Sequence, residues 1–462
     1  MDNLERFFDF EAENHLFDLE YKGIRFWHII RMDIWYKIVN SDENASIDRQ
    51  DERSIFTKLA FLKRVFWQKR QEFKKGTFNL LVFCGQTNYL LNGKKQNPYT
   101  SFLEEMPEFT AKKLNHCIHN ESVPDDEWTT DALRARLLWT KLHNKMSRHR
   151  RDERILNLLN KINDAFPNAI TDVCRYEYKI RNTAKEFAVT KKYYKRLLKD
   201  RFQAVYLIAH YSFWEFALIA AAKELQIPAI EYQHGIIAKN DICYRTNIKS
   251  RHHYFPDYLL TYSQYWNQNV QIPSPCICKA VGNPVIDEAR KRYSGIKKKP
   301  NTVVFYSSYL YGKELSTIAV ELAKVLKREF QIIYKLHPNE FEHWQKWYPN
   351  LMHSRAHVAG KESDTYKLMA EYANHVSVSS AALFEAAAFQ NRIFVFDFPF
   401  FAQFSNSLLE NPDNKIFQNA LELADMLRQK PHQDSPSDPY YYYTNHSFEN
   451  IRKTLHEILD KH

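Results

Sequence analysis

Short apolar runs alternate with longer amphipathic runs through much of the chain. From residue 203 the short runs have the composition of buried strands, and they are QAVYLIA (203–209), IPAIEYQ (227–233), DYLLTY (257–262) and CICKAVG (276–282). The runs between them, SFWEFALIAAAKELQ and SQYWNQNV, have the spacing of helices. Strands that alternate with helices indicate a parallel, doubly wound sheet.

A second alternation of the same kind begins at residue 302. Its expected strands are TVVFYSS (302–308), QIIYKLHP (331–338), AHVAG (356–360), HVSVSS (375–380) and RIFVFDFP (392–399). Helical spacing is found in KELSTIAVELAKVLKREF, SDTYKLMAEY and AALFEAAAFQ, which lie between them. The pattern therefore predicts an α/β protein with two Rossmann-like domains in tandem. The helical tail FENIRKTLHEILDKH is expected to pack back across the pair.

The segments around these two alternations set the expected domain limits. The N-terminal segment has helical spacing, and TFNLLVFCGQ (77–86) predicts the first buried strand. The stretch EARKRYSGIKKKPN is charged and poor in apolar residues, as a linker would be. The expected division is an N-terminal helical region at 1–75, a first Rossmann-like domain at 76–287 with a helical insertion at about 125–200, a linker at 288–301, a second Rossmann-like domain at 302–430, and a C-terminal tail and helix at 431–462.

Length and charge add limits to this outline. A chain of 462 residues suits two or three domains. Its formal charge of +10 favours anionic partners such as nucleotides, phosphates, nucleic acid or acidic membrane surfaces. The six cysteines are scattered without a CxxC pair, which indicates reduced thiols, a cytoplasmic location and no metal site. No run of 18 apolar residues predicts a membrane span, and the acidic N-terminus does not resemble a signal peptide.

Two basic segments suggest surfaces for large anionic partners. In FTKLAFLKRVFWQKRQEFKK (56–75), apolar side chains share one helical face and lysines and arginines fill the rest. This pattern is typical of a helix on the inner face of the cytoplasmic membrane, although a core-packing helix with a solvated basic face has the same pattern. HNKMSRHRRDER (143–154) is also basic, but it lacks interleaved aromatic residues and favours a solvated helical insertion. A nucleic acid partner is therefore not expected.

Polar residues collect where the strands of the second domain end. In doubly wound sheets, ligands bind beyond the carboxyl ends of the strands. A helix that starts there offers free N–H groups and a positive dipole end to phosphate, and hydroxyls and imidazole add donors. A carboxylate five or six residues into such a helix can accept hydrogen bonds from ribose hydroxyls. The predicted nucleotide- and phosphate-binding residues are Ser307, Ser308, Lys335, His337, Pro338, Ser379, Ser380 and Glu385.

The first domain offers a base rather than a phosphate site. His234 ends a strand at a glycine turn, and an imidazole there can act as a general base near neutral pH. Glu231 is the alternative base. Gln233, Gly235 and Asn283 lie at strand ends near the expected domain junction and are predicted to face an acceptor. The chain contains neither GxGxxG nor GxxxxGK[ST], so hydroxyls, imidazole and helix ends would have to hold phosphate.

These residues together resemble bacterial surface-polysaccharide glycosyltransferases of the GT-B fold. The related groups are capsule polymerases, CDP-glycerol glycerophosphotransferases, Kdo transferases and sialyl- or polysialyltransferases. EYQHG matches their HG turn, KLHP their HP motif, and SVSSAALFEA their S/T motif, so the likeness covers roughly residues 200–400. The paired-acid-Gly turn of sialyltransferases is replaced by QHG, and the tryptophan that precedes HG in glycerophosphotransferases is missing.

The resemblance implies an inverting, metal-independent transfer from a nucleotide-activated sugar, without a cofactor. The nucleotide would lie in the second domain, with its ribose near Glu385 and its phosphates at Ser379, Ser380 and His337. A glycan or glycolipid acceptor would lie across the first domain, where His234 would take the proton of the attacking hydroxyl. The product would be a capsule- or lipopolysaccharide-type polymer at the bacterial surface.

Three other functions fit the same residues. A phosphotransferase would move a polyol phosphate from a CDP donor, as in teichoic acid synthesis. A nucleotide-sugar 2-epimerase would act on free nucleotide sugar and need no acceptor. A non-catalytic protein that binds RNA or membranes through its basic charge would show salt-sensitive binding and no nucleotide affinity.

Overall fold

The computed structural model describes most of the chain. The residues outside the described part are 1–2, 40–75, 85–88, 92–93, 116–127, 147–150, 270, 309, 399–406 and 431–437. The basic segment at 56–75, for which membrane binding was predicted, lies outside the described residues. No helix in the part of the chain that is described has both the length and the apolar character needed to cross a bilayer.

The first α/β domain is built on a sheet of seven parallel strands. In spatial order they are β11 (Ile277–Ala280), β10 (Tyr258–Thr261), β9 (Ala229–Tyr232), β8 (Phe202–Leu207), β3 (Phe78–Cys84), β6 (Ala111–Asn115) and β7 (Trp128–Thr129). Every pairing between these neighbours is parallel. The central strands are apolar on both faces because helices cover the sheet on both sides.

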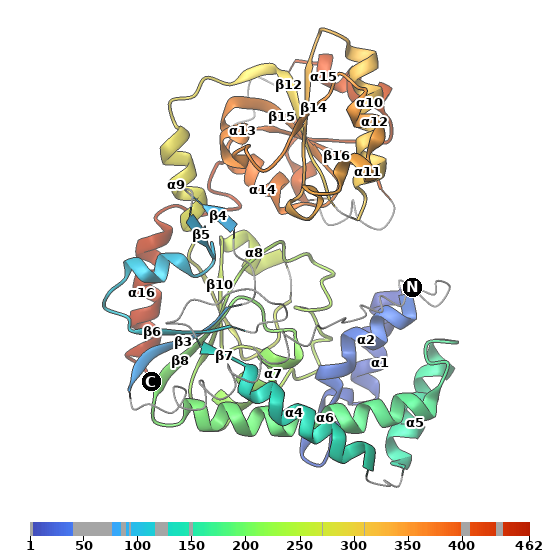
Figure 1. The fold of residues 1–462 in the computed structure, drawn as a ribbon, viewed down its shortest axis with the longest axis vertical. Coiled ribbons are helices and arrows are strands. Elements are labelled where there is room, and N and C mark those ends of the chain that lie inside the picture. The colour runs from blue at the N-terminus through green and yellow to red at the C-terminus, as the bar shows by residue number, and fades with distance from the viewer. Residues whose placement is uncertain are drawn as a thin grey trace.

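A helical layer packs against this sheet, and Figure 1 shows it at the end of the molecule far from the second domain. It contains α4 (Asp131–Met146), α5 (Glu153–Ala165) and α6 (Val173–Leu198), and α6 packs on α7 (Phe213–Glu224), the crossover helix between β8 and β9. The three helices α4, α5 and α6 occupy most of the expected insertion at 125–200.

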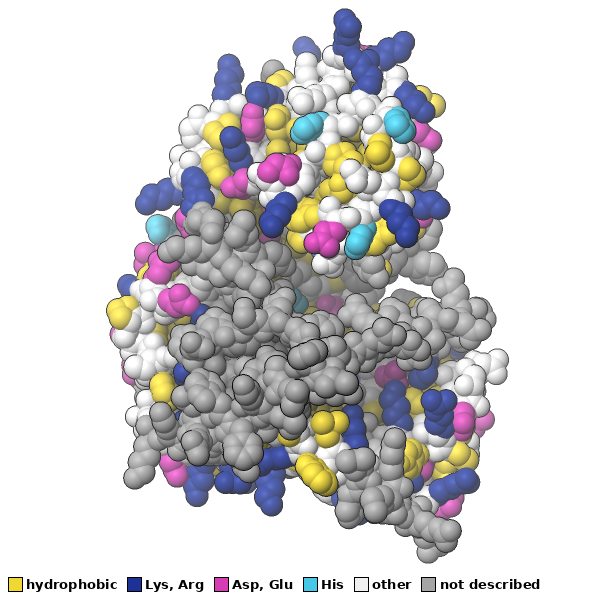
Figure 2. Space-filling view, in the orientation of Figure 1, with side chains coloured by type: hydrophobic (Ala, Val, Ile, Leu, Met, Phe, Trp, Pro, Cys, Tyr) yellow, Lys and Arg dark blue, Asp and Glu magenta, His cyan; other side chains and the backbone are white. Residues whose placement is uncertain are grey.

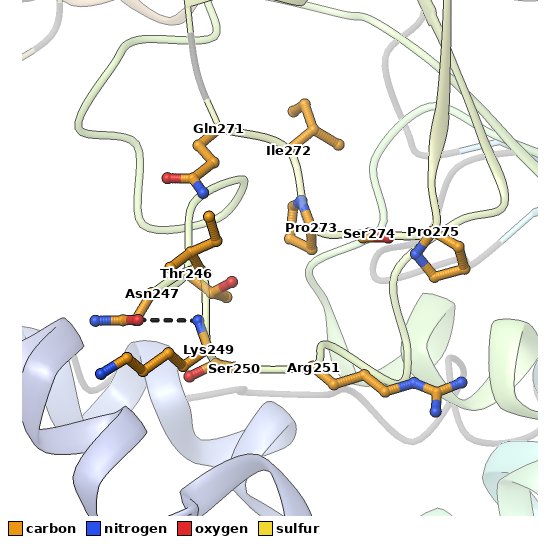
Figure 3. Close-up of a pocket in the computed structure, with 11 residues that line it drawn as sticks. Thr246, Asn247, Lys249, Ser250, Arg251, Gln271, Ile272, Pro273, Ser274 and Pro275 are labelled. Carbon is orange, nitrogen blue, oxygen red and sulfur yellow. Dashed lines mark hydrogen bonds between the residues drawn. The ribbon is translucent and has the colours of Figure 1, made fainter.

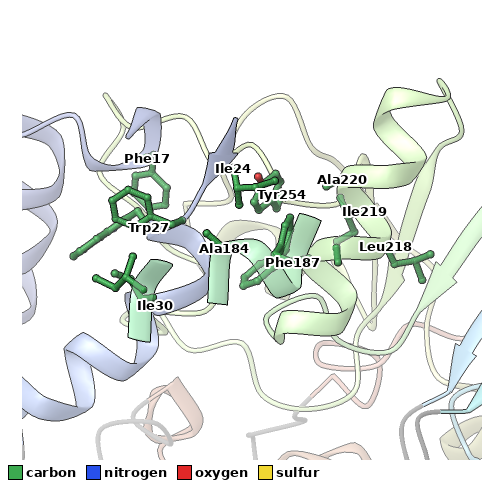
Figure 4. Close-up of a cluster of buried hydrophobic side chains, with 14 of the residues drawn as sticks. Phe17, Ile24, Trp27, Ile30, Ala184, Phe187, Leu218, Ile219, Ala220 and Tyr254 are labelled. Atoms are coloured by element: carbon green, nitrogen blue, oxygen red, sulfur yellow. The ribbon is translucent and has the colours of Figure 1, made fainter. Parts of the chain in front are cut away.

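The N-terminal segment joins this layer rather than standing apart. It contains α1 (Asn3–Glu13), the 3₁₀ turn η1 (Leu16–Asp18) and α2 (Trp27–Val39). Figure 4 shows Trp27 and Ile30 of α2 in one apolar cluster with Phe187 of α6 and Tyr254. A short antiparallel hairpin, β1 (Glu20–Tyr21) with β2 (Ile24–Arg25), lies between the two helices.

A buried ion pair fixes the N-terminal helices to the loop that follows β9. Arg31 Nε lies 2.6 Å from Glu11 Oε1, and both side chains are almost completely buried. Arg31 also donates to the backbone carbonyls of Ile242 and Arg245. A buried charge needs such partners, because an unpaired one costs several kcal/mol (~3–5). The pair therefore holds the 242–245 loop against the N-terminal helices.

The second domain has a sheet of six parallel strands. In spatial order they are β14 (His357–Ala359), β13 (Gln331–Lys335), β12 (Lys299–Tyr306), β15 (Tyr372–Ser377), β16 (Arg392–Phe396) and β17 (Lys415–Phe417). The covering helices are α10 (Gly312–Leu326), α11 (Trp344–Trp347), α12 (Pro349–Met352), α13 (Thr365–Glu371), α14 (Ala381–Ala388) and α15 (Ala420–Arg428). The prediction of a doubly wound α/β fold with two Rossmann-like domains and an N-terminal helical extension is confirmed.

The expected linker at 288–301 is mostly regular structure. The helix α9 (Pro284–Tyr293) runs through its first half, and β12 already begins at Lys299. Asn283 explains the helix start, because its Oδ1 accepts a hydrogen bond from Val285 N at 3.0 Å and Pro284 occupies the first turn. Residues 294–298 alone connect the two elements.

The C-terminal segment returns from the second domain to the first, as Figure 1 shows for α16 (Ser447–Leu459). Trp266 Nε1 donates to Tyr442 O at 2.8 Å, and Thr444 N donates to Tyr262 O at 2.9 Å. Gly282, with φ of +91°, lets the returning chain approach, since a Cβ there would lie 2.5 Å from Thr444 O. Trp266 also contacts Phe384 of α14, so the apolar core of the first sheet continues into the second domain.

Candidate active site

A turn held by one glutamine presents His234 at the carboxyl end of β9. Gln233 is buried, and its Oε1 accepts from Tyr262 N at 2.8 Å while its Nε2 donates to Gly235 O at 2.7 Å. Both side-chain atoms are thus used by the backbone, so Gln233 shapes the turn and the expectation that it faces an acceptor is not met. Gly235 has open space where a Cβ would stand, which leaves room for a ligand near the turn.

The imidazole of His234 is partly exposed, and one of its two ring nitrogens is hydrogen-bonded. Its Nε2 lies 3.0 Å from the hydroxyl of Tyr211, and its Nδ1 is buried without a hydrogen-bond partner among the described residues. Burial lowers the pKa of His234, while the negative charge of Glu231 opposes that shift. The backbone of Ile208 also favours the protonated ring, although no hydrogen bond of normal geometry joins the two. A neutral imidazole at the resting state is what a general base requires.

Glu231 lies below this histidine and does not reach the surface. Its side chain is fully buried, with Oε2 2.7 Å from His210 Nδ1 and Oε1 2.7 Å from the Tyr244 hydroxyl. The expectation of Glu231 as an alternative base is therefore corrected, because a carboxylate with two buried donors and no exposed surface cannot meet an acceptor. It positions its neighbours instead.

His210 and Tyr211 are site residues that the sequence reasoning missed. They lie three and four residues beyond the end of β8, at the same edge of the sheet as His234. His210 Nε2 lies 3.0 Å from Cys243 O, so both ring nitrogens face acceptor oxygens. The available signal was the HYS sequence after a strongly apolar strand, since β8 and β9 are neighbours in a parallel sheet.

The second domain places a serine pair at the start of α14. Ser380 is the N-cap of this helix, and its Oγ accepts from Ala382 N at 3.3 Å. The neighbouring Ser379 is held by Tyr311, whose hydroxyl donates to Ser379 O at 2.7 Å. Ser308, which follows the adjacent strand β12, is partly exposed. These hydroxyls lie at one sheet edge with a helix start, which suits a phosphate group.

His337 adds an imidazole with a fixed tautomer beyond β13. Its Nδ1 accepts from Asn339 N at 3.2 Å, and its backbone N–H donates to Glu340 Oε2 at 2.8 Å. Since Nδ1 is the acceptor, the neutral ring carries its proton on Nε2, which is the donor that a phosphate oxygen needs. Pro338 opens the 3₁₀ turn η3 (Pro338–Glu340) that fixes this geometry. Burial lowers the pKa of His337, while the negative charge of Glu340 opposes that shift.

Two side chains that were predicted to bind phosphate are engaged in hydrogen bonds within the protein. Ser307 Oγ lies between the Tyr334 hydroxyl and Glu340 Oε1, each at 2.9 Å. Lys335 Nζ donates to Gly360 O at 2.5 Å and lies over the ring of Phe341. Both side chains are buried. Their expected contact with phosphate is therefore corrected to a role in holding the loops that carry His337.

Glu385 lies in α14 and carries an ionisable side chain. Its carboxylate has no hydrogen bond or ion pair within the described part of the chain, and burial raises its pKa to about 7. The side chain keeps partial solvent contact, so a ligand hydroxyl can reach it. An ionisable group kept unpaired in this way is a candidate for binding, because paired carboxylates are the rule in protein interiors.

A layer of tyrosines connects the two halves. Burial and the nearby Glu385 carboxylate both raise the pKa values of Tyr262, Tyr366 and Tyr443. The phenol of Tyr99 also raises the pKa of each of these three side chains. Tyr99 also meets the ring of His234 edge-to-face at 6.2 Å. His234, through Tyr99, and Glu385 therefore both lie near the same group of tyrosines. Asn283, predicted to face the acceptor, is buried as the N-cap of α9 and takes no part in this layer.

A cavity of about 540 Å³ lies elsewhere in the first domain. Figure 3 shows that two loops line it, one with Thr246, Lys249 and Arg251 and the other with Gln271 to Pro275. None of the strand-end residues described above contributes to it. The chemistry of those residues, rather than this hollow, defines the candidate site.

Comparison with known proteins gives distant structural likenesses. No family model and no curated protein sequence matches the chain. UDP-GlcNAc 2-epimerase from Methanocaldococcus jannaschii aligns over 82% of this chain and 99% of its own, with 11% identity and a TM-score of 0.48. The wall teichoic acid polymerase TagF aligns over 93% and 98%, with 12% identity and a TM-score of 0.46. UDP-GlcNAc 2-epimerase from Neisseria meningitidis aligns over 82% and 100%, with 13% identity and a TM-score of 0.45. At these scores the likenesses assign no reaction, and the fold rests on the two parallel sheets themselves.

Proposed function

We propose that the protein is an inverting, metal-independent glycosyltransferase that uses a nucleotide-activated sugar to build a bacterial surface polysaccharide of the capsule or lipopolysaccharide type. The observation that carries this proposal is that two unlike groups lie near the same group of tyrosines. One is the unpaired Glu385 carboxylate beside the serine N-cap of α14, and the other is the partly exposed His234 imidazole.

On the donor side, each group has a place in nucleotide recognition. The Glu385 carboxylate would accept hydrogen bonds from ribose hydroxyls. The Ser380 hydroxyl, the N-terminal end of α14 with its positive dipole, and the Nε2–H of His337 would face the phosphates. Donors fixed before the reaction stabilise the charge that develops on the leaving phosphate without reorganising. No cofactor is needed for this chemistry.

On the acceptor side, His234 would remove the proton of the attacking hydroxyl. The acceptor oxygen forms a bond to the anomeric carbon while the bond from that carbon to the phosphate oxygen breaks. The electron pair of the broken bond leaves with the nucleotide. A single displacement of this kind inverts the anomeric centre. The acceptor would be a glycan or glycolipid.

The main alternative is transfer of a polyol phosphate from a CDP donor, in which the same base activates the acceptor and phosphorus is the electrophile. The epimerases and the polymerase named above differ in reaction, so their likeness does not separate these functions. The non-catalytic alternative needs a continuous basic surface. On the face shown in Figure 2, the described lysines and arginines are interleaved with acidic and apolar side chains. Membrane contact through 56–75 stays a prediction.

Thermal unfolding in the presence of CMP, CDP, UDP, GDP or phosphate, with EDTA present, tests the donor site. A nucleotide that binds the folded protein raises its melting temperature by mass action. The shift is expected with one nucleotide class, and it should be lost in Glu385→Gln and Ser380→Ala but kept in Glu321→Gln, which changes an exposed carboxylate on α10. Absence of any shift would refute the proposal. Analysis of the product by ³¹P NMR then separates a glycosidic bond from a phosphodiester.

A further inference from the structure

The hydroxyl of Tyr211 occupies the reactive edge of His234. The two groups are 3.0 Å apart, and both side chains are partly exposed. Tyr211 follows β8 and its ring lies against His210 and Tyr244, with centroid separations of 5.5 and 6.0 Å. The phenol is therefore held in place by packing, and any proton that reaches Nε2 of His234 must pass its hydroxyl or displace it.

The other nitrogen of His234 offers no second route. Nδ1 is buried and has no partner among the described residues. A base whose Nδ1 is shielded from a substrate can take a proton only at Nε2, and a neutral imidazole carries one hydrogen on one nitrogen. If His234 is the base, Nε2 is the free acceptor at rest and Tyr211 is the donor in their hydrogen bond. The lone pairs of the phenol oxygen are then available to a second donor.

We propose that Tyr211 is a catalytic residue that relays the proton from the acceptor hydroxyl to His234. In this step, which rests on the proposed function, the acceptor O–H gives its proton to the Tyr211 oxygen as the phenol gives its own proton to Nε2. The acceptor oxygen bonds to the anomeric carbon, and the nucleotide phosphate leaves with the electron pair of the broken bond. Tyr211 ends the step neutral, and His234 ends it as an imidazolium.

The groups beneath the pair support this direction of transfer. The buried Glu231 carboxylate favours the protonated form of His234, as its effect on the pKa of that ring shows. Hydrogen bonds to Tyr244 and His210 fix the position of the Glu231 carboxylate. Burial raises the pKa of Tyr211 above its ordinary value, which keeps the phenol protonated between turnovers. The relay thus needs no resting phenolate.

Tyr211→Phe tests the relay, because it removes only the hydroxyl. The variant is expected to keep the nucleotide-induced thermal shift and a KM for acceptor within a few-fold of wild type. Its kcat should fall by roughly 10²–10⁴, the range of a lost proton-transfer group. Tyr254→Phe is the matched control, since it removes a phenol hydroxyl in the same domain that accepts from Arg25 N at 3.3 Å, and its kcat should be unchanged. A Tyr211→Phe enzyme with a kcat within twofold of wild type would overturn the relay and leave the proposed function standing.

A second readout needs no substrate. Selective ¹⁵N-histidine labelling, with His234→Gln to assign the signal, reports which ring nitrogen of His234 carries the proton. The expected state in wild type is a bare Nε2 that accepts from Tyr211, with a change of its shift in Tyr211→Phe. A protonated Nε2 in neutral wild-type protein would overturn the relay. A wild-type protein that transfers from no nucleotide donor would overturn the proposed function and the relay together.

Discussion

Replacing Glu385 with glutamine is expected to stabilise the free protein at alkaline pH while it weakens nucleotide binding. Burial raises the pKa of this carboxyl from an ordinary 4.5 to about 7. The folded state therefore holds the proton more tightly than the unfolded chain does. The cost of ionising Glu385 is absent below the unfolded value, grows as pH rises between the two pKa values, and is complete above the folded one. Glutamine keeps the shape and never pays this cost.

The size of the effect follows from the shift. A change of one pKa unit corresponds to about 1.4 kcal/mol, so the penalty reaches up to about 3 kcal/mol at pH 8 and stays below about 1 kcal/mol at pH 5. For the ligand, losing a charged hydrogen-bond acceptor costs about 1.5–3 kcal/mol, which weakens nucleotide binding roughly 10- to 150-fold. One substitution should therefore move stability and affinity in opposite directions.

Thermal unfolding at pH 5 and pH 8, with and without nucleotide, measures both quantities. Glu385→Gln should melt several degrees above wild type at pH 8 and close to it at pH 5. Glu321→Gln, an exposed carboxylate in the same domain, should show no such pH dependence. Equal melting of Glu385→Gln and wild type at pH 8 would refute the burial argument. A full nucleotide shift in the variant would refute the role of Glu385 in binding ribose.

The remaining predictions concern the turns and the buried network. Glu231→Gln should lower the free energy of unfolding by roughly 3–5 kcal/mol in urea titrations, because His210 and Tyr244 lose a buried anion; a loss below about 1 kcal/mol would contradict this. Gly282→Ala should lower the melting temperature, since φ is +91° and the new Cβ would lie 2.5 Å from Thr444 O. Gly235→Ala, which enters open space, should leave the melting temperature unchanged; equal behaviour of the two glycine variants would disprove the steric argument. His337→Ala should weaken nucleotide binding about tenfold by calorimetry, and unchanged affinity would remove His337 from the site.

The strands of the two large sheets that the sequence did not predict share one physical property. β6, with the sequence AKKLN, and the short β7 and β17 carry few apolar residues and lie towards the edges of their sheets. Their extended conformation depends on hydrogen bonding to the neighbouring strand of the sheet rather than on their own composition. The central strands β8, β9 and β12 are mostly apolar in their buried part, so they could be recognised without a partner.

The site shows the same division. Because parallel strands end at one edge, the sequence alone brought His234, His337, Ser380 and Glu385 into consideration as strand-end and helix-start residues. The sequence could not show which polar side chains are engaged in internal hydrogen bonds. Ser307, Lys335 and Gln233 are of residue types that often bind ligands, but each is hydrogen-bonded within the protein.

The sequence by itself determined the alternation of strands and helices, and with it the two parallel sheets and the sheet edges where chemistry can occur. Only the tertiary structure decided that Glu231 is buried under His210 and Tyr244 and that Tyr211 faces His234. Local periodicity depends on the backbone of each segment, whereas a hydrogen bond between side chains 13, 21 or 23 residues apart depends on how neighbouring strands and their loops pack.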